Sequence, residues 1–292
     1  MQLTEKIADF VLSNQYADIP EAALEQAKMG IMDWVFVSLA AAKDGVDTVQ
    51  GFSQLMTSKG GLEESTLIGL GRKLTENQAA LVNGCIGHMM DYDETCPKVR
   101  SHLFASIFPA LLASAELREI SGKELLLGFI TGHEVALRVG EAITPAWIQA
   151  GWHGTSLFGI FGSAIGCSKI MGLEKDNIKT ALGLVSSMAG GVAANFGTQA
   201  KPLHAGMAAE RGLFAAQLAE SGFTSNQGAL DGALGFYHAY NWGQAADMAV
   251  IDRLGDPWGL ETPGMSSIKL YPCCHGLATN IECGTRVHHR KR

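Results

Sequence analysis

Apolar residues recur at helical spacing along almost the whole chain, and this periodicity restricts the fold more than any other feature. Leu3, Ile7 and Val11 form the first such stripe, as expected for one buried helix face. A second helix is predicted after Pro20, because proline is common in the first helical turn. The remaining predicted helices cover residues 76–90, a segment after Pro109, and residues 121–142, 155–171, 176–188 and 204–220. Only residues 65–68 and 267–270 have a strand-like pattern, so the chain is predicted to be all-α.

Two kinds of local signal refine this prediction. Ser121 and Glu124 form a capping-box pattern, which predicts that a helix begins there. Several glycines stand inside apolar segments, where each lowers helix propensity, and close approach of neighbouring helices is the expected compensation. These glycines are Gly159, Gly162, Gly166, Gly190 and Gly191. Residues 241–263 are rich in Gly, Asp and Pro and are the best candidate for a linker.

The residue balance indicates a folded protein with a large interior. The chain has 292 residues, of which 47% are hydrophobic and only 17% are charged. Its net charge is −7 and no basic stripe is present, so nucleic acid is not an expected partner. A small anionic substrate would be repelled at long range, and its site would therefore need local positive charge.

Cysteine usage and hydropathy indicate an intracellular protein. The six cysteines are scattered and match no zinc-binding spacing, so they are expected to be reduced, and no metal is expected. The N-terminal MQLTEKIADF does not resemble a signal peptide, and no apolar run is long enough to span a membrane. We therefore expect a cytoplasmic protein without a membrane partner.

The motif GHMMDYDET carries the densest group of potential site residues. If the helix over residues 76–90 continued through it, His88, Asp91 and Thr95 would share one helix face. Asp93 and Glu94 would then point elsewhere. The alternative interpretation is a solvated loop at a helix end, for which acidic residues are common.

Four further segments place His or Lys beside Gly or Pro turns. They are the stretch with Lys98, Arg100 and His102, the GWHGTS stretch with His153, the GTQAKPLHAG stretch with Lys201 and His204, and the KLYPCCHG stretch with Lys269 and His275. Each has a structural alternative, such as a lysine that reaches solvent along an apolar stem. Together they predict one cationic site for a substrate with several carboxylates.

Five of these segments resemble the signature motifs of the MmgE/PrpD family. They are GHMMDYDET, SHLFASIFPALLASAE, GWHGTSLFGIFGSAIG, KPLHAGMAAERG and KLYPCCHG, in the family's order. The family includes 2-methylcitrate dehydratases, cis-aconitate decarboxylases and iminodisuccinate epimerases. The chain departs from the pattern where His102 is followed by Leu103 and Phe104 instead of Pro and Ser.

The resemblance implies a large all-helical domain, a smaller α+β lid domain, a homodimer, and no metal or organic cofactor. By motif, the implied site residues are Asp91, Thr95, His102, His153, Lys201 and His275. Residues 1–265 are expected to form the helical domain. Residues 266–292 are expected to begin the connection to a lid that is largely or wholly absent, and to end in an atypical basic tail.

The family's shared chemistry implies proton transfer at a carbon next to a carboxylate. His102 is expected to move the proton, with His275 as second choice, and Lys201 and His153 to stabilise the charged carboxylate. Asp91 would orient a histidine or contact a substrate hydroxyl, and Thr95 would supply a hydrogen bond. We expect a lyase of the 2-methylcitrate dehydratase type. The alternatives are a cis-aconitate decarboxylase, an iminodisuccinate epimerase, or an inactive fragment that serves as an interaction module.

Overall fold

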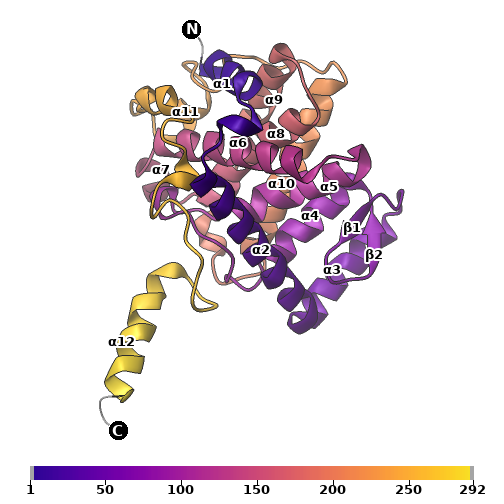
Figure 1. Ribbon diagram of the computed structural model, residues 1–292, viewed down its shortest axis with the longest axis vertical. Helices are drawn as coiled ribbons and strands as arrows, with labels where there is room; N and C mark the ends of the chain where they lie inside the picture. The colour runs from indigo at the N-terminus through magenta and orange to yellow at the C-terminus, as the bar shows by residue number, and fades with distance from the viewer. Residues whose placement is uncertain (1–2, 290–292) are drawn as a thin grey trace.

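The computed structural model describes residues 3–289, and helices dominate them (Figure 1). The first helices are α1 (Leu3–Ser13), α2 (Glu21–Asp44), α3 (Val46–Ser58), α4 (Glu76–Gly87), α5 (Leu103–Arg118) and α6 (Gly122–Glu141). They are followed by α7 (Ala146–Gln149), α8 (Gly154–Ile170), α9 (Lys175–Met188), α10 (Ala200–Glu220), α11 (Phe236–Tyr240) and α12 (Ala278–His289). Strands β1 (Ser65–Leu67) and β2 (Arg72–Leu74) pair antiparallel. The prediction of an all-α fold is confirmed, with one small hairpin.

Helix α8 lies at the centre of the core. Every residue from Gly154 to Ser168 is buried, as expected for a helix that is apolar on all sides. It packs against α5, α6 and α10, and α4 packs against α5 and α10. The site motifs are located at the ends of these central helices, and so the rigid core holds them in place.

Glycines allow the central helices to approach closely, as predicted for three positions. A Cβ added at Gly162 would lie 2.4 Å from Ile107 Cδ1, and one at Gly132 would lie 2.4 Å from the Gly162 carbonyl oxygen. Gly159 and Gly166 are similarly crowded. The prediction was wrong for Gly190 and Gly191, because both lie in the turn beyond α9, where Gly190 meets open space and Gly191 has φ +105°.

Several predicted helix ends need correction. The capping box of Ser121 and Glu124 is confirmed at the start of α6. However, α4 ends at Gly87, short of residue 90, and α5 begins at Leu103, well before Pro109. Proline inside a helix costs about 3 kcal/mol, but residues Leu103 to Leu111 are all buried, and this packing outweighs the cost.

The segments proposed as linker and second strand belong to the helical body. Pro257 accepts a hydrogen bond from Arg138 Nη2 at 2.6 Å, and the amide of Gly259 donates one to Glu134 Oε2 at 2.7 Å. Residues 241–263 are thus packed on α6 and are no free linker. Ser267 pairs with Thr95 as an isolated antiparallel bridge, so residues 267–270 form no extended strand.

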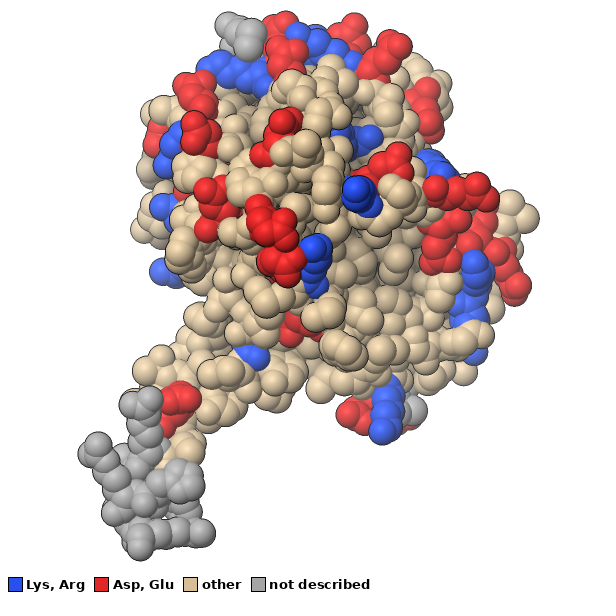
Figure 2. All heavy atoms as spheres, viewed as in Figure 1, with Lys and Arg blue, Asp and Glu red and all other residues tan. Residues whose placement is uncertain are grey.

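The periphery carries two exposed features. Helix α12 stands away from the body (Figure 1), and only residues 290–292 of the predicted basic tail lie outside the described residues. On α2, Met29, Met32, Phe36 and Leu39 are exposed. Figure 2 shows that the surface over the lower half of α2 carries few charged side chains. Among residues 3–289, none of the helices has the length and hydropathy needed to cross a membrane.

Candidate active site

A cavity of about 460 Å³ lies at the ends of the central helices. This volume suits a small organic ligand. The lining residues are Asp91, Arg100, His102, Trp147, Ile148, Trp152, His153, Gly154, Ala193, Phe196, Gly197, Lys201 and Cys274. Four of the residues predicted from sequence, namely Asp91, His102, His153 and Lys201, therefore meet at one cavity.

Asp91 holds two lysines that are far apart in sequence. It lies in the turn after α4 with φ +49°, and its Oδ2 is 2.8 Å from Lys201 Nζ of α10. Its Oδ1 is 2.7 Å from Lys269 Nζ, which also donates to the Asp91 carbonyl oxygen at 2.6 Å. Burial raises the pKa of Asp91, but the hydrogen bonds from Lys201 and Lys269 outweigh it and lower the pKa to about 2. The carboxylate is thus ionised and fixes both ammonium groups.

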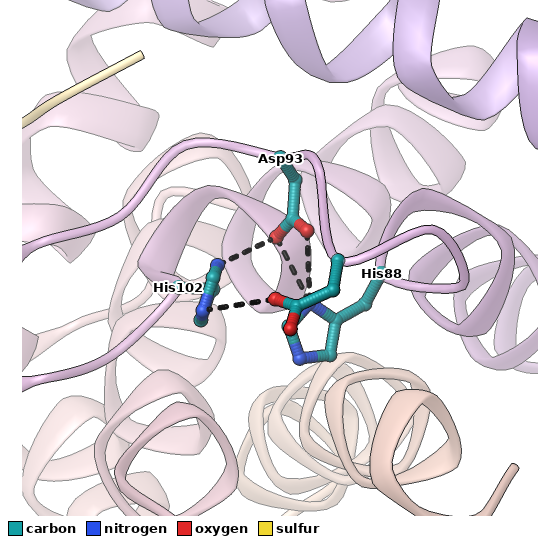
Figure 3. Close-up of side chains that lie close together, drawn as sticks. His88, Asp93 and His102 are labelled. Atoms are coloured by element: carbon teal, nitrogen blue, oxygen red, sulfur yellow. Dashed lines mark hydrogen bonds and ion pairs between the residues drawn. The ribbon is translucent and has the colours of Figure 1, made fainter. Parts of the chain in front are cut away.

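Asp93 lies between two histidines, as Figure 3 shows. His88 Nδ1 is 3.0 Å from both carboxylate oxygens, and His102 Nδ1 is 3.1 Å from Oδ2. Burial raises the pKa of Asp93, but the histidines outweigh it and hold the pKa well below its usual range. Since an ionised carboxylate only accepts, it favours a proton on each Nδ1. His102 then presents Nε2 on the side of Asp91, whose Oδ1 is 3.7 Å away.

This arrangement contradicts the predicted helical face of GHMMDYDET. Because α4 ends at Gly87 and His88 caps it, His88, Asp91 and Thr95 do not follow a helical repeat. Asp93 and Glu94 were expected to point elsewhere, but both are fully buried. Burial raises the pKa of Glu94 well above its usual range, with Asp93 adding to the effect, and this favours the neutral form of the carboxyl group. Three acidic residues within so apolar a chain were the signal that could have indicated a buried cluster.

His153 is held at the start of α8. Its Nδ1 is 3.1 Å from His204 Nδ1 of α10, and its ring packs edge-on against Phe196. Burial, followed by the neighbouring histidines and Lys201, lowers the pKa of His153. The ring is therefore a neutral hydrogen-bonding group at the cavity. Thr155 Oγ1 of α8 accepts a hydrogen bond from the His102 amide at 3.0 Å, which ties the two histidine segments together.

Two predicted residues lie outside the cavity lining, and Lys269, like Asp93 and Arg100, was missed. Thr95 is buried, and its backbone pairs with Ser267. His275 is exposed and lines a separate hollow of about 150 Å³ with Lys269. Lys269 was noted in its motif but was not among the implied site residues. It is 5% exposed, and a buried lysine needs an anionic partner, which here is Asp91.

The same cluster offers the donor types of a metal site. Ligand atoms of His88, Asp91, Asp93 and His102 all lie within 4.8 Å of one another. Imidazole and carboxylate together suit zinc or iron. However, both oxygens of Asp91 contact lysine ammonium groups, and Asp93 contacts both imidazoles. A cation would have to displace these contacts, so the cluster fits a metal poorly.

The cavity thus brings Lys201, Arg100 and two histidines together at the ends of the central helices. Sequence comparison then identifies the family: residues 5–249 match the MmgE/PrpD N-terminal domain, and the chain belongs to this family. Cis-aconitate decarboxylase of Aspergillus terreus is 29% identical over 296 residues, which cover 96% of this chain and 59% of the relative. The enzyme of Mus musculus is 32% identical over 257 residues, covering 86% of this chain and 52% of the relative. The chain thus spans between half and three fifths of these relatives.

Proposed function

We propose that the cavity binds a small polycarboxylic acid and that the chain carries a lyase site of the family, with cis-aconitate as the first candidate substrate. The observation that carries this proposal is Asp91 with Lys201 at 2.8 Å and Lys269 at 2.7 Å, beside His102 and His153. Lys201 is the lysine of this pair that lines the cavity, and an ammonium group that is already oriented needs no reorganisation when a carboxylate arrives. The similarity to cis-aconitate decarboxylases supports this substrate.

In the proposed reaction His102 delivers a proton to carbon. Loss of carbon dioxide from the substrate leaves its bonding electron pair on the carbon skeleton, and that skeleton then takes up one proton. His102 suits this role because Asp93 orients its Nδ1 side and leaves Nε2 on the Asp91 side. Lys201 would stabilise the carboxylate that shares the developing charge, and neutral His153 would donate a hydrogen bond to it.

Dehydration is the second candidate reaction, and activity assays distinguish it from decarboxylation. The expected 2-methylcitrate dehydratase activity needs a general acid for a departing hydroxyl, and His102 or His153 would supply it. The relatives described above favour decarboxylation. Assays of the purified chain with cis-aconitate, 2-methylcitrate and iminodisuccinate separate the three activities by carbon dioxide release, loss of the hydroxyl and change of configuration.

A binding experiment tests the site independently of turnover. Lys201→Met keeps the apolar stem but removes the charge, and we expect an affinity for cis-aconitate at least about tenfold lower by calorimetry. Lys179→Met is the matched control, because Lys179 pairs with Asp176 on the surface of α9. An unchanged affinity in the Lys201 variant would remove this residue from the site.

The homodimer and the cytoplasmic location implied at the outset stay predictions. The apolar stripe of Met29, Met32, Phe36 and Leu39 on α2 is a described surface that suits a second copy. Light scattering of the wild type and of Phe36→Asp tests it, since a dimer through α2 would dissociate in the variant. The division into a helical domain over residues 1–265 and a connecting segment over 266–292 is likewise proposed, and limited proteolysis near residue 265 examines it.

A further inference from the structure

Arg100 is a cation of the cavity to which the proposed reaction gives no role. It follows the short 3₁₀ turn Pro97–Val99 and has φ +44°, in the left-handed region. A residue other than glycine in this region is strained by about 1 kcal/mol or more. Here the strain is held by the tight pairing of Cys96 with Ser101, whose amides and carbonyls bond at 2.7 and 3.2 Å. The turn places Arg100 at the cavity lining.

The charges around the cavity leave Arg100 uncompensated. Apart from the histidines, the charged residues of the lining are Asp91, Lys201 and Arg100. Asp91 and Lys201 pair at 2.8 Å, whereas the structure pairs Arg100 with no carboxylate anywhere within residues 3–289. Its neighbour Lys98 differs, because its Nζ lies 3.5 Å from Glu141 and the residue is not part of the lining.

We propose that Arg100 binds a carboxylate of the substrate other than the one at Lys201, so that the site selects a tricarboxylate over a dicarboxylate. This inference rests on the proposed function and extends it to specificity. Asp91 contacts both Lys201 and Lys269, whereas Asp93 contacts the two histidines His88 and His102. The two lysines therefore keep one positive charge beyond the charge of Asp91, which matches one carboxylate of the substrate. A further carboxylate needs a further cation. The planar guanidinium of arginine offers two parallel donors to a carboxylate, which a lysine does not.

The aromatic lining agrees with two separate carboxylate positions in the cavity. Trp147, Trp152 and Phe196 line it together with Ile148. Such walls contact the hydrocarbon part of a small ligand, whereas Arg100 itself is exposed to solvent. The hydrocarbon skeleton of the acid would contact these walls, with one carboxylate at the Asp91 and Lys201 side and another at Arg100.

Calorimetric titration with unreactive acids tests the proposal without turnover. The probes are propane-1,2,3-tricarboxylate, glutarate and methylsuccinate, and each dicarboxylate lacks one carboxyl group of the first acid. The wild type is expected to bind the tricarboxylate about tenfold or more tighter than either dicarboxylate. In Arg100→Gln this preference is expected to shrink to within about twofold, with Arg100→Lys between the two because it keeps charge but loses the fork.

The outcomes separate the inference from the function on which it rests. Lys98→Gln is the neighbouring control and is expected to keep the wild-type preference. Since the Arg100 side chain is exposed, the Gln variant should keep the wild-type unfolding midpoint, which confirms that it folds. A tricarboxylate preference that persists in Arg100→Gln would overturn the inference while the proposed function stands. A wild type that binds none of the acids would overturn both.

Discussion

Replacing Asp91 by Asn removes the carboxylate that holds Lys201 and Lys269, and the structure predicts a large loss of stability. The Lys269 side chain is only 2% exposed, and Asp91 provides its ion pair at 2.7 Å. Without the aspartate, a buried ammonium group loses its counter-charge. Removing one partner of a buried pair costs about 3–5 kcal/mol, and the 25% exposure of the Asp91 side chain places this case near the lower end.

The lowered pKa of Asp91 gives a second, independent magnitude for this loss of stability. A fall from 3.8 to about 2 corresponds to about 2 to 3 kcal/mol of stability at neutral pH. The sign follows from the direction of the shift. Because the folded-state pKa lies below the unfolded value, this stability is present above about pH 4 and is lost as pH falls through about 2. About half of it remains at pH 3.

Urea unfolding of the wild type and of Asp91→Asn at pH 7 and pH 3 measures the loss of stability and its dependence on pH. We expect the variant to be about 2 to 3 kcal/mol less stable at pH 7, and the difference to narrow by about 1 kcal/mol at pH 3. Asp252→Asn is the control, because Asp252 pairs with Lys6 at a site where the two side chains are 59% and 34% exposed. This control substitution should lower the free energy of unfolding by less than about 1 kcal/mol. A loss below about 1 kcal/mol for Asp91→Asn, or an equal loss at both pH values, would refute the reasoning.

Three further predictions concern packing, proton transfer and access to the cavity. Gly132→Ala should destabilise by about 1–3 kcal/mol, because its Cβ would lie 2.4 Å from the Gly162 carbonyl oxygen. The added Cβ of Gly51→Ala in α3 meets nothing within 4 Å, so this substitution should stabilise the protein by up to about 1 kcal/mol. Urea titrations in which the two substitutions change the free energy of unfolding in the same direction would contradict this reasoning. If the chain turns over cis-aconitate, Asp93→Asn should lower kcat by about tenfold or more and change the pH profile, and an unchanged profile would exclude orientation of His102 by Asp93. Cys274 is exposed and lines the cavity, so its reaction with iodoacetamide, followed by mass spectrometry, should be slower when propane-1,2,3-tricarboxylate is present. Cys283 is also exposed and is the control. Equal protection of Cys283 would show that the acid slows labelling in general.

Features that depend on neighbouring residues in the chain were predictable from sequence. The helical class, the start of α6 at the Ser121 capping box and the crowding at Gly159, Gly162 and Gly166 all follow from local spacing. So does the position of His153, because an imidazole between glycines suits a helix start, and α8 begins directly after it. These properties involve contacts within a few turns or a generic need for close packing.

Other features were decided by the tertiary structure alone. Pro109 remains inside α5 because burial of that helix outweighs the lost hydrogen bond. Asp93 turns inward because α4 ends early and two histidines, one of them from the start of α5, surround its carboxylate. No local pattern shows which polar groups packing will remove from water.

Lys269 shows most clearly the difference between what the sequence determined and what the tertiary structure decided. Its motif marked it as one of several cationic residues, yet its partner Asp91 lies 178 positions earlier in the chain. Sequence alone indicated that positive charge would gather at a site, and it named four of the residues that line the cavity, namely Asp91, His102, His153 and Lys201. Only the folded chain decided which charges neutralise one another and which, such as that of Arg100, line the cavity without a carboxylate partner among residues 3–289. The physical reason is that charge compensation depends on distances of a few ångströms, and these are set by the packing of helices that are remote in sequence.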